Sequence, residues 1–151
     1  MTGLLFKRIQ RPYKMKTVYG DMVGDLFHHG HVEFIKTLRQ FGDKVIVGVI
    51  GDKNASLYKR KPICSLDERV KVITACKYVD EVIPNSPLII DKDFIQQNNI
   101  DLVVHAHHVD DQSQDDFFKV PIEMGIFHRV KYTPNISTTE LIQRCSRRNG
   151  L

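Results

Sequence analysis

Three histidines fall within four residues, in the segment His28-His29-Gly30-His31, where a strand-like run gives way to helical periodicity. A helix start directs free backbone N–H groups and the positive end of its dipole outward, so it favours an anion. Gly30 would let a phosphate approach the backbone closely. Neighbouring imidazoles can donate hydrogen bonds to phosphoryl oxygens as charge builds in a transition state. The pattern favours a phosphate site over a surface histidine cluster or a metal site.

Two other segments carry residues that bind phosphate well. Lys59, Lys61 and the nearby Arg69 supply cations, and Ser137-Thr138-Thr139 supplies hydroxyls at the start of a predicted helix. Phosphoryl transfer depends on positioning and charge neutralisation more than on covalent help. Simpler interpretations stay open: a solvated charge run, a surface arginine, and an N-cap serine that can cap and bind phosphate together.

Strand and helix patterns alternate along the chain. Predicted strands cover residues 17–20, 44–50, 79–83, 101–105 and 130–132. Predicted helices cover residues 32–41, a segment capped by Ser65 with Glu68 three residues later, 91–98, 114–124, and a last segment capped by Ser137. The stretch 51–64 between them is polar and basic, which predicts a loop.

This alternation predicts a single Rossmann-like, doubly wound α/β domain with a five-stranded parallel sheet over residues 17–151. Ligands of such sheets bind beyond the carboxyl ends of the strands, near the point where the strand order reverses. The unusual polar residues follow the predicted strands, so they should meet at that edge.

The charge of the chain is uneven. The chain has a net charge of +4, and its excess of positive charge comes from residues 1–16, which carry five basic side chains and no acidic one. We expect a flexible basic leader there, and contact of this leader with an anionic lipid surface or a nucleic acid stays open. The remainder is close to neutral, so the domain itself is not expected to bind nucleic acid.

The composition, the apolar runs and the cysteines of the chain indicate a cytoplasmic protein. Its hydrophobic content of 42% is typical of a globular domain, and its longest apolar runs, such as 45–50, are too short to cross a bilayer. Its cysteines, Cys64, Cys76 and Cys145, are odd in number and widely spaced. They therefore indicate reduced thiols rather than a disulfide framework or a zinc site.

The segment 18–31, VYGDMVGDLFHHGH, resembles the HxGH signature of the cytidylyltransferase family within the nucleotidyltransferase superfamily. The similarity continues through 67–69, 78–82 and 136–139 and covers roughly residues 17–147. The resemblance is strongest to the phosphocholine, phosphoethanolamine and glycerol-3-phosphate enzymes. It implies transfer of CMP from CTP to a small phosphorylated alcohol, giving a CDP-alcohol and pyrophosphate. An ATP-using adenylyltransferase similar to FAD synthetase, or a degenerate member that binds nucleotide without turnover, remains an alternative.

The resemblance also implies roles for individual residues. His28 and His31 would contact the triphosphate and stabilise the transition state, and Asp25 would support the site. The remaining positions would bind phosphates from two loops and a helix start: Lys59, Lys61, Arg69, Ser137, Thr138 and Thr139. Mg²⁺ would arrive with the triphosphate, without side-chain ligands from the protein. A homodimer formed through residues 78–82 is a further implication.

The chain departs from the family pattern before its last helix. Tyr132-Thr133-Pro134-Asn135 stands where relatives usually have Arg-Thr-x-Gly, so an expected arginine is missing. Arg129 or Lys131 could replace it. Asn135 tolerates a left-handed turn, so the backbone can survive the loss of glycine.

A second departure concerns the acceptor. After the fourth predicted strand, His105, His107 and Asp110 form a candidate substrate pocket, but a carboxylate that relatives place beside His105 is absent. Leu88 also stands where an aromatic is usual, and quaternary ammonium groups favour aromatic faces. Phosphoethanolamine, paired with Asp110 or Asp111, and a polyol phosphate therefore fit better than phosphocholine.

Overall fold

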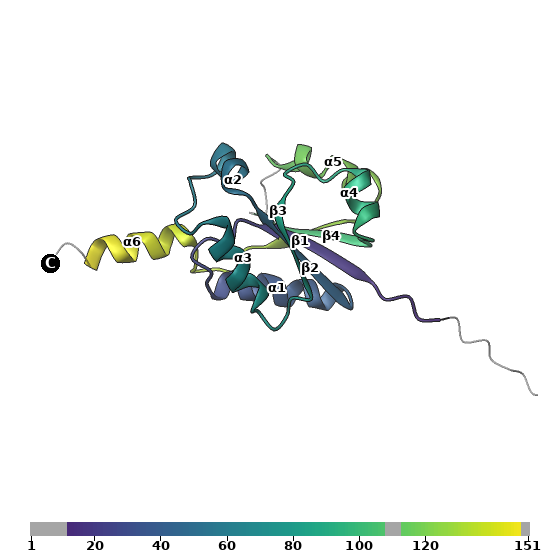
Figure 1. Ribbon diagram of the computed structural model, residues 1–151, viewed down its shortest axis with the longest axis horizontal. Coiled ribbons are helices and arrows are strands. Elements are labelled where there is room, and N and C mark those ends of the chain that lie inside the picture. The colour runs from purple at the N-terminus through teal and green to yellow at the C-terminus, as the bar shows by residue number, and fades with distance from the viewer. Residues whose placement is uncertain (1–11, 108–112, 149–151) are drawn as a thin grey trace, which may run out of the picture.

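A computed structural model describes residues 12–107 and 113–148. Five strands form one parallel sheet in the order β3-β2-β1-β4-β5 (Figure 1). The strands are β1 (Thr17–Met22), β2 (Lys44–Ile50), β3 (Glu81–Ser86), β4 (Leu102–His107) and β5 (Phe127–Lys131). The predicted five-stranded α/β fold is confirmed. The order reverses between β1 and β4, so the segments after these two strands diverge and open the usual ligand position.

Helices cover both faces of the sheet (Figure 1). They are α1 (His29–Phe41), α2 (Asp52–Tyr58), α3 (Leu66–Thr74), α4 (Lys92–Gln97), α5 (Lys119–Glu123), preceded by a 3₁₀ turn (Asp115–Phe118), and α6 (Thr138–Arg148). One core lies between the sheet and α1 and α3, and a second lies between the sheet and α4 with the 3₁₀ turn. Alternate residues of β1 separate the two cores, since Val18 belongs to the first and Tyr19 to the second.

The elements depart from the predicted ones in three places. Residues 52–58, predicted as loop, form α2, whose Ala55 packs on Val23 and Ile50. The predicted helix 114–124 is a 3₁₀ turn followed by the short α5, because Pro121 lacks an N–H and can occupy only the first turn. The last strand begins earlier than predicted, at Phe127.

The described end of the leader is held against the domain. The Tyr13 hydroxyl and the Lys16 backbone N–H each donate to the Asp43 carboxylate, at 2.6 and 2.8 Å. The Lys14 ammonium lies 2.9 Å from Asp101. Residues 13–16 thus contact the domain, while residues 1–11 lie outside the described residues, and the flexibility of the leader stays a prediction. In the described part of the chain, no helix has the length and apolar character needed to cross a membrane.

Helix α6 extends away from the sheet, and only its start lies against the domain (Figure 1). None of its residues is buried. Its first turn is nevertheless anchored, because the Thr138 hydroxyl donates to the backbone carbonyl of Asp25 at 3.0 Å. The β1–α1 turn and the start of α6 therefore lie side by side at the carboxyl edge of the sheet.

Candidate functional site

The two outer histidines of the β1–α1 turn form a reciprocal cap at the start of α1. The Gly30 N–H donates to His28 Nδ1, and the His28 N–H donates to His31 Nδ1, each at 3.1 Å. An Nδ1 atom that accepts a hydrogen bond leaves the proton of a neutral imidazole on Nε2. The two rings stack with centroids 3.9 Å apart. The turn therefore presents two Nε2–H donors side by side.

Both imidazoles are held neutral. Burial, together with the positive charge that His28 would carry if protonated and that of Lys59, lowers the pKa of His31 from 6.5 to about 3, although the Asp25 carboxylate acts in the opposite direction. Burial, followed by the charge of His29, lowers the pKa of His28 as well. A protonated ring would lose its Nδ1 acceptor, so the cap itself depends on the neutral form.

The start of α6 closes on this turn. The Thr138 hydroxyl, which donates to the Asp25 carbonyl, lies 3.5 Å from His28 Nε2. A Cβ at Gly30 would lie 2.9 Å from the Ile136 side chain, so only glycine lets the segment before α6 approach this closely. Ser137 Oγ accepts the Glu140 N–H at 3.0 Å, which confirms the predicted cap.

Asp25 fixes the long loop between α2 and α3. Its two carboxylate oxygens accept the backbone N–H groups of Ile63 and Cys64, both at 2.9 Å, and it is buried. The predicted supporting role of Asp25 thus has a geometric basis. The loop that it holds carries the predicted cations.

Lys59 is a cation of this loop whose charge reaches His31. Neighbouring groups surround the Lys59 side chain, although solvent still reaches the residue. The resulting desolvation lowers the pKa of its ammonium, and the negative charge of Asp21 acts in the opposite direction. The charge of Lys59 acts on His31 in turn. Lys61 is exposed on the same loop. The structure thus brings Lys59 to the histidines, and places Lys61 on the surface nearby.

Arg69 lies elsewhere, and its prediction as a phosphate ligand needs correction. Its side chain is 1% exposed. Its guanidinium donates to the carbonyls of Cys64, Val23 and Ile50 and to the Asp52 carboxylate. These contacts use four of its five N–H donors. Arg69 therefore ties β1, β2, α2 and α3 together behind the site.

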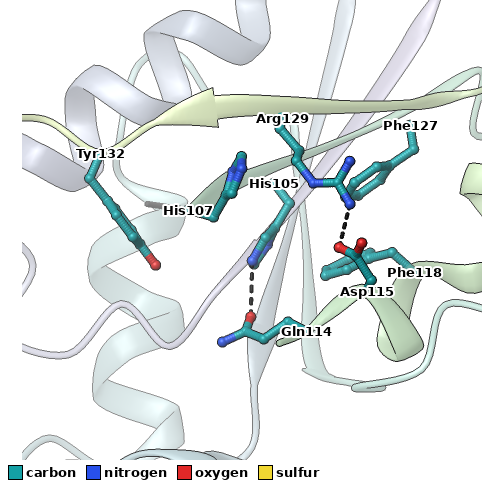
Figure 2. A pocket seen from close by; sticks show the side chains of 8 residues that line it. All are labelled: His105, His107, Gln114, Asp115, Phe118, Phe127, Arg129 and Tyr132. Carbon is teal, nitrogen blue, oxygen red and sulfur yellow. Dashed lines mark hydrogen bonds and ion pairs between the residues drawn. The ribbon is translucent and has the colours of Figure 1, made fainter. Parts of the chain in front are cut away.

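A second group of polar residues lies at the carboxyl ends of β4 and β5 (Figure 2). The pocket is lined by His105, His107, Gln114, Asp115, Phe118, Phe127, Arg129 and Tyr132. His107 Nδ1 is buried there without a hydrogen-bond partner. The predicted convergence of His105 and His107 is confirmed, whereas Asp110 lies outside the described residues.

Arg129 belongs to this second pocket. It pairs with Asp115 and packs over the Phe127 ring (Figure 2). It therefore lies in the same pocket as Tyr132, the residue at the position of the missing arginine. Lys131 is exposed at the end of β5.

The sequence analysis did not identify Asp21, which links the histidine turn and its cationic loop to the pocket at the ends of β4 and β5. Its buried carboxylate lies 3.1 Å from His105 Nδ1, and its charge acts on Lys59 and Tyr58. The sequence offered one indication of this role, because Asp21 is a charged residue near the end of a buried strand, at the ligand edge of the sheet. Sequence reasoning also missed Arg60, whose guanidinium donates to Thr139 Oγ1 at 3.2 Å. Across residues 12–107 and 113–148, no three His, Cys, Asp or Glu side chains are grouped to hold a metal ion.

Comparisons with known proteins agree with this geometry. The family model described as cytidylyltransferase-like matches residues 24–144. The chain is 40% identical over 137 residues to an ethanolamine-phosphate cytidylyltransferase of Dictyostelium discoideum, covering 85% of this chain and 37% of that protein. It is 34% identical over 134 residues to a choline-phosphate cytidylyltransferase of Saccharomyces cerevisiae, covering 86% of this chain and 31% of that protein.

The fold also has a counterpart among solved structures. The lipopolysaccharide core biosynthesis protein of Thermoplasma volcanium superposes with a TM-score of 0.66 at 22% identity, over 80% of this chain and 99% of that one. The chain spans about a third of the length of the two cytidylyltransferases described above. The matched region includes the histidine turn, the cationic loop and the start of α6, and the chain belongs to the cytidylyltransferase-like family.

Proposed function

We propose that this chain transfers CMP from CTP to a small phosphorylated alcohol, forming a CDP-alcohol and releasing pyrophosphate. The observation that carries the proposal is the pair of neutral imidazoles at the start of α1, whose Nε2–H donors stand beside the start of α6. Relatives of the chain named as ethanolamine-phosphate and choline-phosphate cytidylyltransferases support the same reaction.

The proposed reaction needs little covalent help from the protein. A phosphate oxygen of the acceptor attacks the α-phosphorus of CTP, and the bond from that phosphorus to the pyrophosphate oxygen breaks. No general base is required, because a phosphate is already ionised near neutral pH. His28 and His31 would donate to phosphoryl oxygens, and Lys59 would neutralise charge on the leaving pyrophosphate. Lys61, Ser137 and Thr139, all exposed near this opening, would add contacts to the phosphates.

Mg²⁺ belongs to the proposal as a companion of the triphosphate. The carboxylates near the histidines are already engaged, since Asp25 accepts two backbone N–H groups and Asp21 pairs with His105. The described residues therefore do not fit a metal site built from protein ligands. The ion would be held by phosphate oxygens and water, as Mg²⁺ commonly is.

The pocket around His105 and His107 is our candidate for the alcohol end of the acceptor. The unpaired Nδ1 of His107 offers a polar contact, and the Asp21 carboxylate lies against His105, whereas the charge of Asp115 is offset by its pair with Arg129. Such a setting suits a primary ammonium or several hydroxyls. We propose phosphoethanolamine as the first acceptor to test, with glycerol 3-phosphate as the second.

We also propose that the chain forms a homodimer through residues 78–82. This segment leads into β3, the outermost strand on its side of the sheet, and it is held firmly by Asp80, which binds Arg39 and the Val45 N–H. A rigid segment at a sheet edge is suited to pairing with a second copy.

The cytoplasm is the compartment we propose for this chain. Cys64, Cys76 and Cys145 are all free thiols in the structure. Free thiols persist best where glutathione and thioredoxin keep them reduced.

The proposed function is tested by pyrophosphate release with CTP or ATP and a panel of phosphorylated alcohols, with products identified by mass. We expect turnover with CTP and phosphoethanolamine or glycerol 3-phosphate. Turnover with ATP alone would indicate an adenylyltransferase. Protection against thermal unfolding by CTP without any turnover would indicate a degenerate member, because a ligand of the folded state stabilises it.

A further inference from the structure

The proposed triphosphate site has fewer available cations than its residue types suggest. His28 and His31 are neutral, Arg69 is buried among carbonyls, and Arg129 pairs with Asp115 in the other pocket. A triphosphate carries several negative charges that must be met in the bound state. The charge must therefore come from the loop between α2 and α3.

Arg60 is the guanidinium of that loop, and it reaches across to α6. Its Nη1 donates to Thr139 Oγ1 at 3.2 Å, and its Nη2 lies 3.7 Å from Asp25 Oδ2. The longer distance is beyond a hydrogen bond, and Asp25 already accepts two backbone N–H groups. The side chain of Arg60 is 41% exposed. It therefore keeps N–H donors and solvent access for an anionic ligand at the first turn of α6.

We propose that Arg60 binds the triphosphate at the first turn of α6. This inference rests on the proposed function. The planar fork of arginine matches two phosphate oxygens at once, which a lysine ammonium cannot do. Arg60 is a binding residue here, and its contact with Thr139 holds it ready beside the helix start.

The experiment compares the wild-type chain with Arg60→Gln, Arg60→Lys and the matched control Arg144→Gln. Arg144 lies further along α6 and pairs with Glu140 on the surface. We measure the KM for CTP, kcat, and the thermal shift given by CTP with Mg²⁺. Arg60→Gln should raise the KM and weaken CTP binding about 10- to 100-fold, as loss of a charge-assisted contact does. Arg60→Lys should recover part of the loss, and Arg144→Gln should match the wild type.

The outcomes separate this inference from the function on which it rests. If the wild type is active and Arg60→Gln binds CTP with unchanged affinity, the inference alone is overturned. The same holds if Arg60→Gln lowers the melting temperature of the free protein but leaves the CTP affinity unchanged. A wild type that neither binds CTP nor releases pyrophosphate would overturn the proposed function, and the role of Arg60 with it.

Discussion

His28 and His31 differ from ordinary surface histidines because their Nδ1 atoms are already committed to backbone N–H groups. The same bonds that begin α1 therefore fix the tautomer of each ring and leave Nε2–H free to act. A structural role and a chemical role coincide in one pair of side chains. Their effects on activity and on stability should be separable by comparison with their neighbour His29, which is exposed.

Substitution of His31 should remove a donor to the developing charge. We expect His31→Ala to lower kcat by about 100- to 1000-fold, as loss of one oxyanion donor does elsewhere, while the far-UV circular dichroism stays native. His29→Ala is the matched control and should keep wild-type turnover. An unchanged rate in His31→Ala would remove this residue from the mechanism.

The lowered pKa of His31 predicts an acid-sensitive stability. The folded state resists protonation down to about pH 3, whereas the unfolded ring takes up a proton near pH 6.5. The stability from this group is therefore complete above pH 6.5 and falls as the pH drops toward 3. Between pH 7.5 and 5.5 the loss should be about 1 kcal/mol, measured by urea unfolding. His31→Gln should show a correspondingly smaller loss over the same range, and an equal loss would contradict this assignment.

The sequence predicts the chemistry of some residues better than others, depending on where their partners lie. The placement of His28 and His31 at a helix start follows from the sequence because their hydrogen-bond partners lie within three residues, whereas their contact with a triphosphate stays a prediction. The prediction of Arg69 as a phosphate ligand is wrong because its guanidinium donates to the Val23 and Ile50 carbonyls. Sequence patterns do not show where these carbonyls lie in the fold. Arg60 is passed over because its partner Thr139 lies 79 residues away.

At the scale of elements, Arg69 joins four of them. Truncating it removes the guanidinium donor from the buried carbonyls of Val23 and Ile50 and from the carbonyl of Cys64. We expect Arg69→Ala to lower the free energy of unfolding by about 3 kcal/mol or more in urea titrations. Lys71→Ala, on the exposed face of the same helix, should change it by less than about 0.5 kcal/mol. A near-neutral Arg69→Ala would restore the interpretation as a phosphate ligand.

Helices and strands can be predicted where their burial requires a periodic pattern of apolar residues. The β-branched run of β2 is buried almost throughout and identifies a central strand. By contrast, α2 has only Ala55 buried, so its seven residues lack helical periodicity and were predicted as loop. The β5 segment alternates weakly with charged residues, so its start was placed too late.

At the scale of the whole molecule, the reversal of strand order between β1 and β4 separates two neighbouring candidate sites. The histidine turn follows β1, and the pocket of His105 and His107 lies where β4 ends. Asp21 lies between them and contacts His105. This topology was predictable from the alternation of strands and helices, whereas the pairing of the two sites through one carboxylate was not.

The proposed homodimer has a direct measure. Sedimentation equilibrium should give a mass twice that of the 17.5 kDa chain, with dissociation only on dilution. A single species at the monomer mass, across micromolar concentrations, would rule out pairing of this chain by itself.

The central claim is that two imidazoles, a lysine loop and the start of α6 hold one triphosphate together. A crystal structure of the protein with CTP and Mg²⁺, without acceptor, tests it most directly. We predict phosphate oxygens within hydrogen-bond distance of Nε2 of both His28 and His31, with Lys59 and Thr139 contacting the same triphosphate. A triphosphate bound away from the histidines, or held by only one of these segments, would contradict the account.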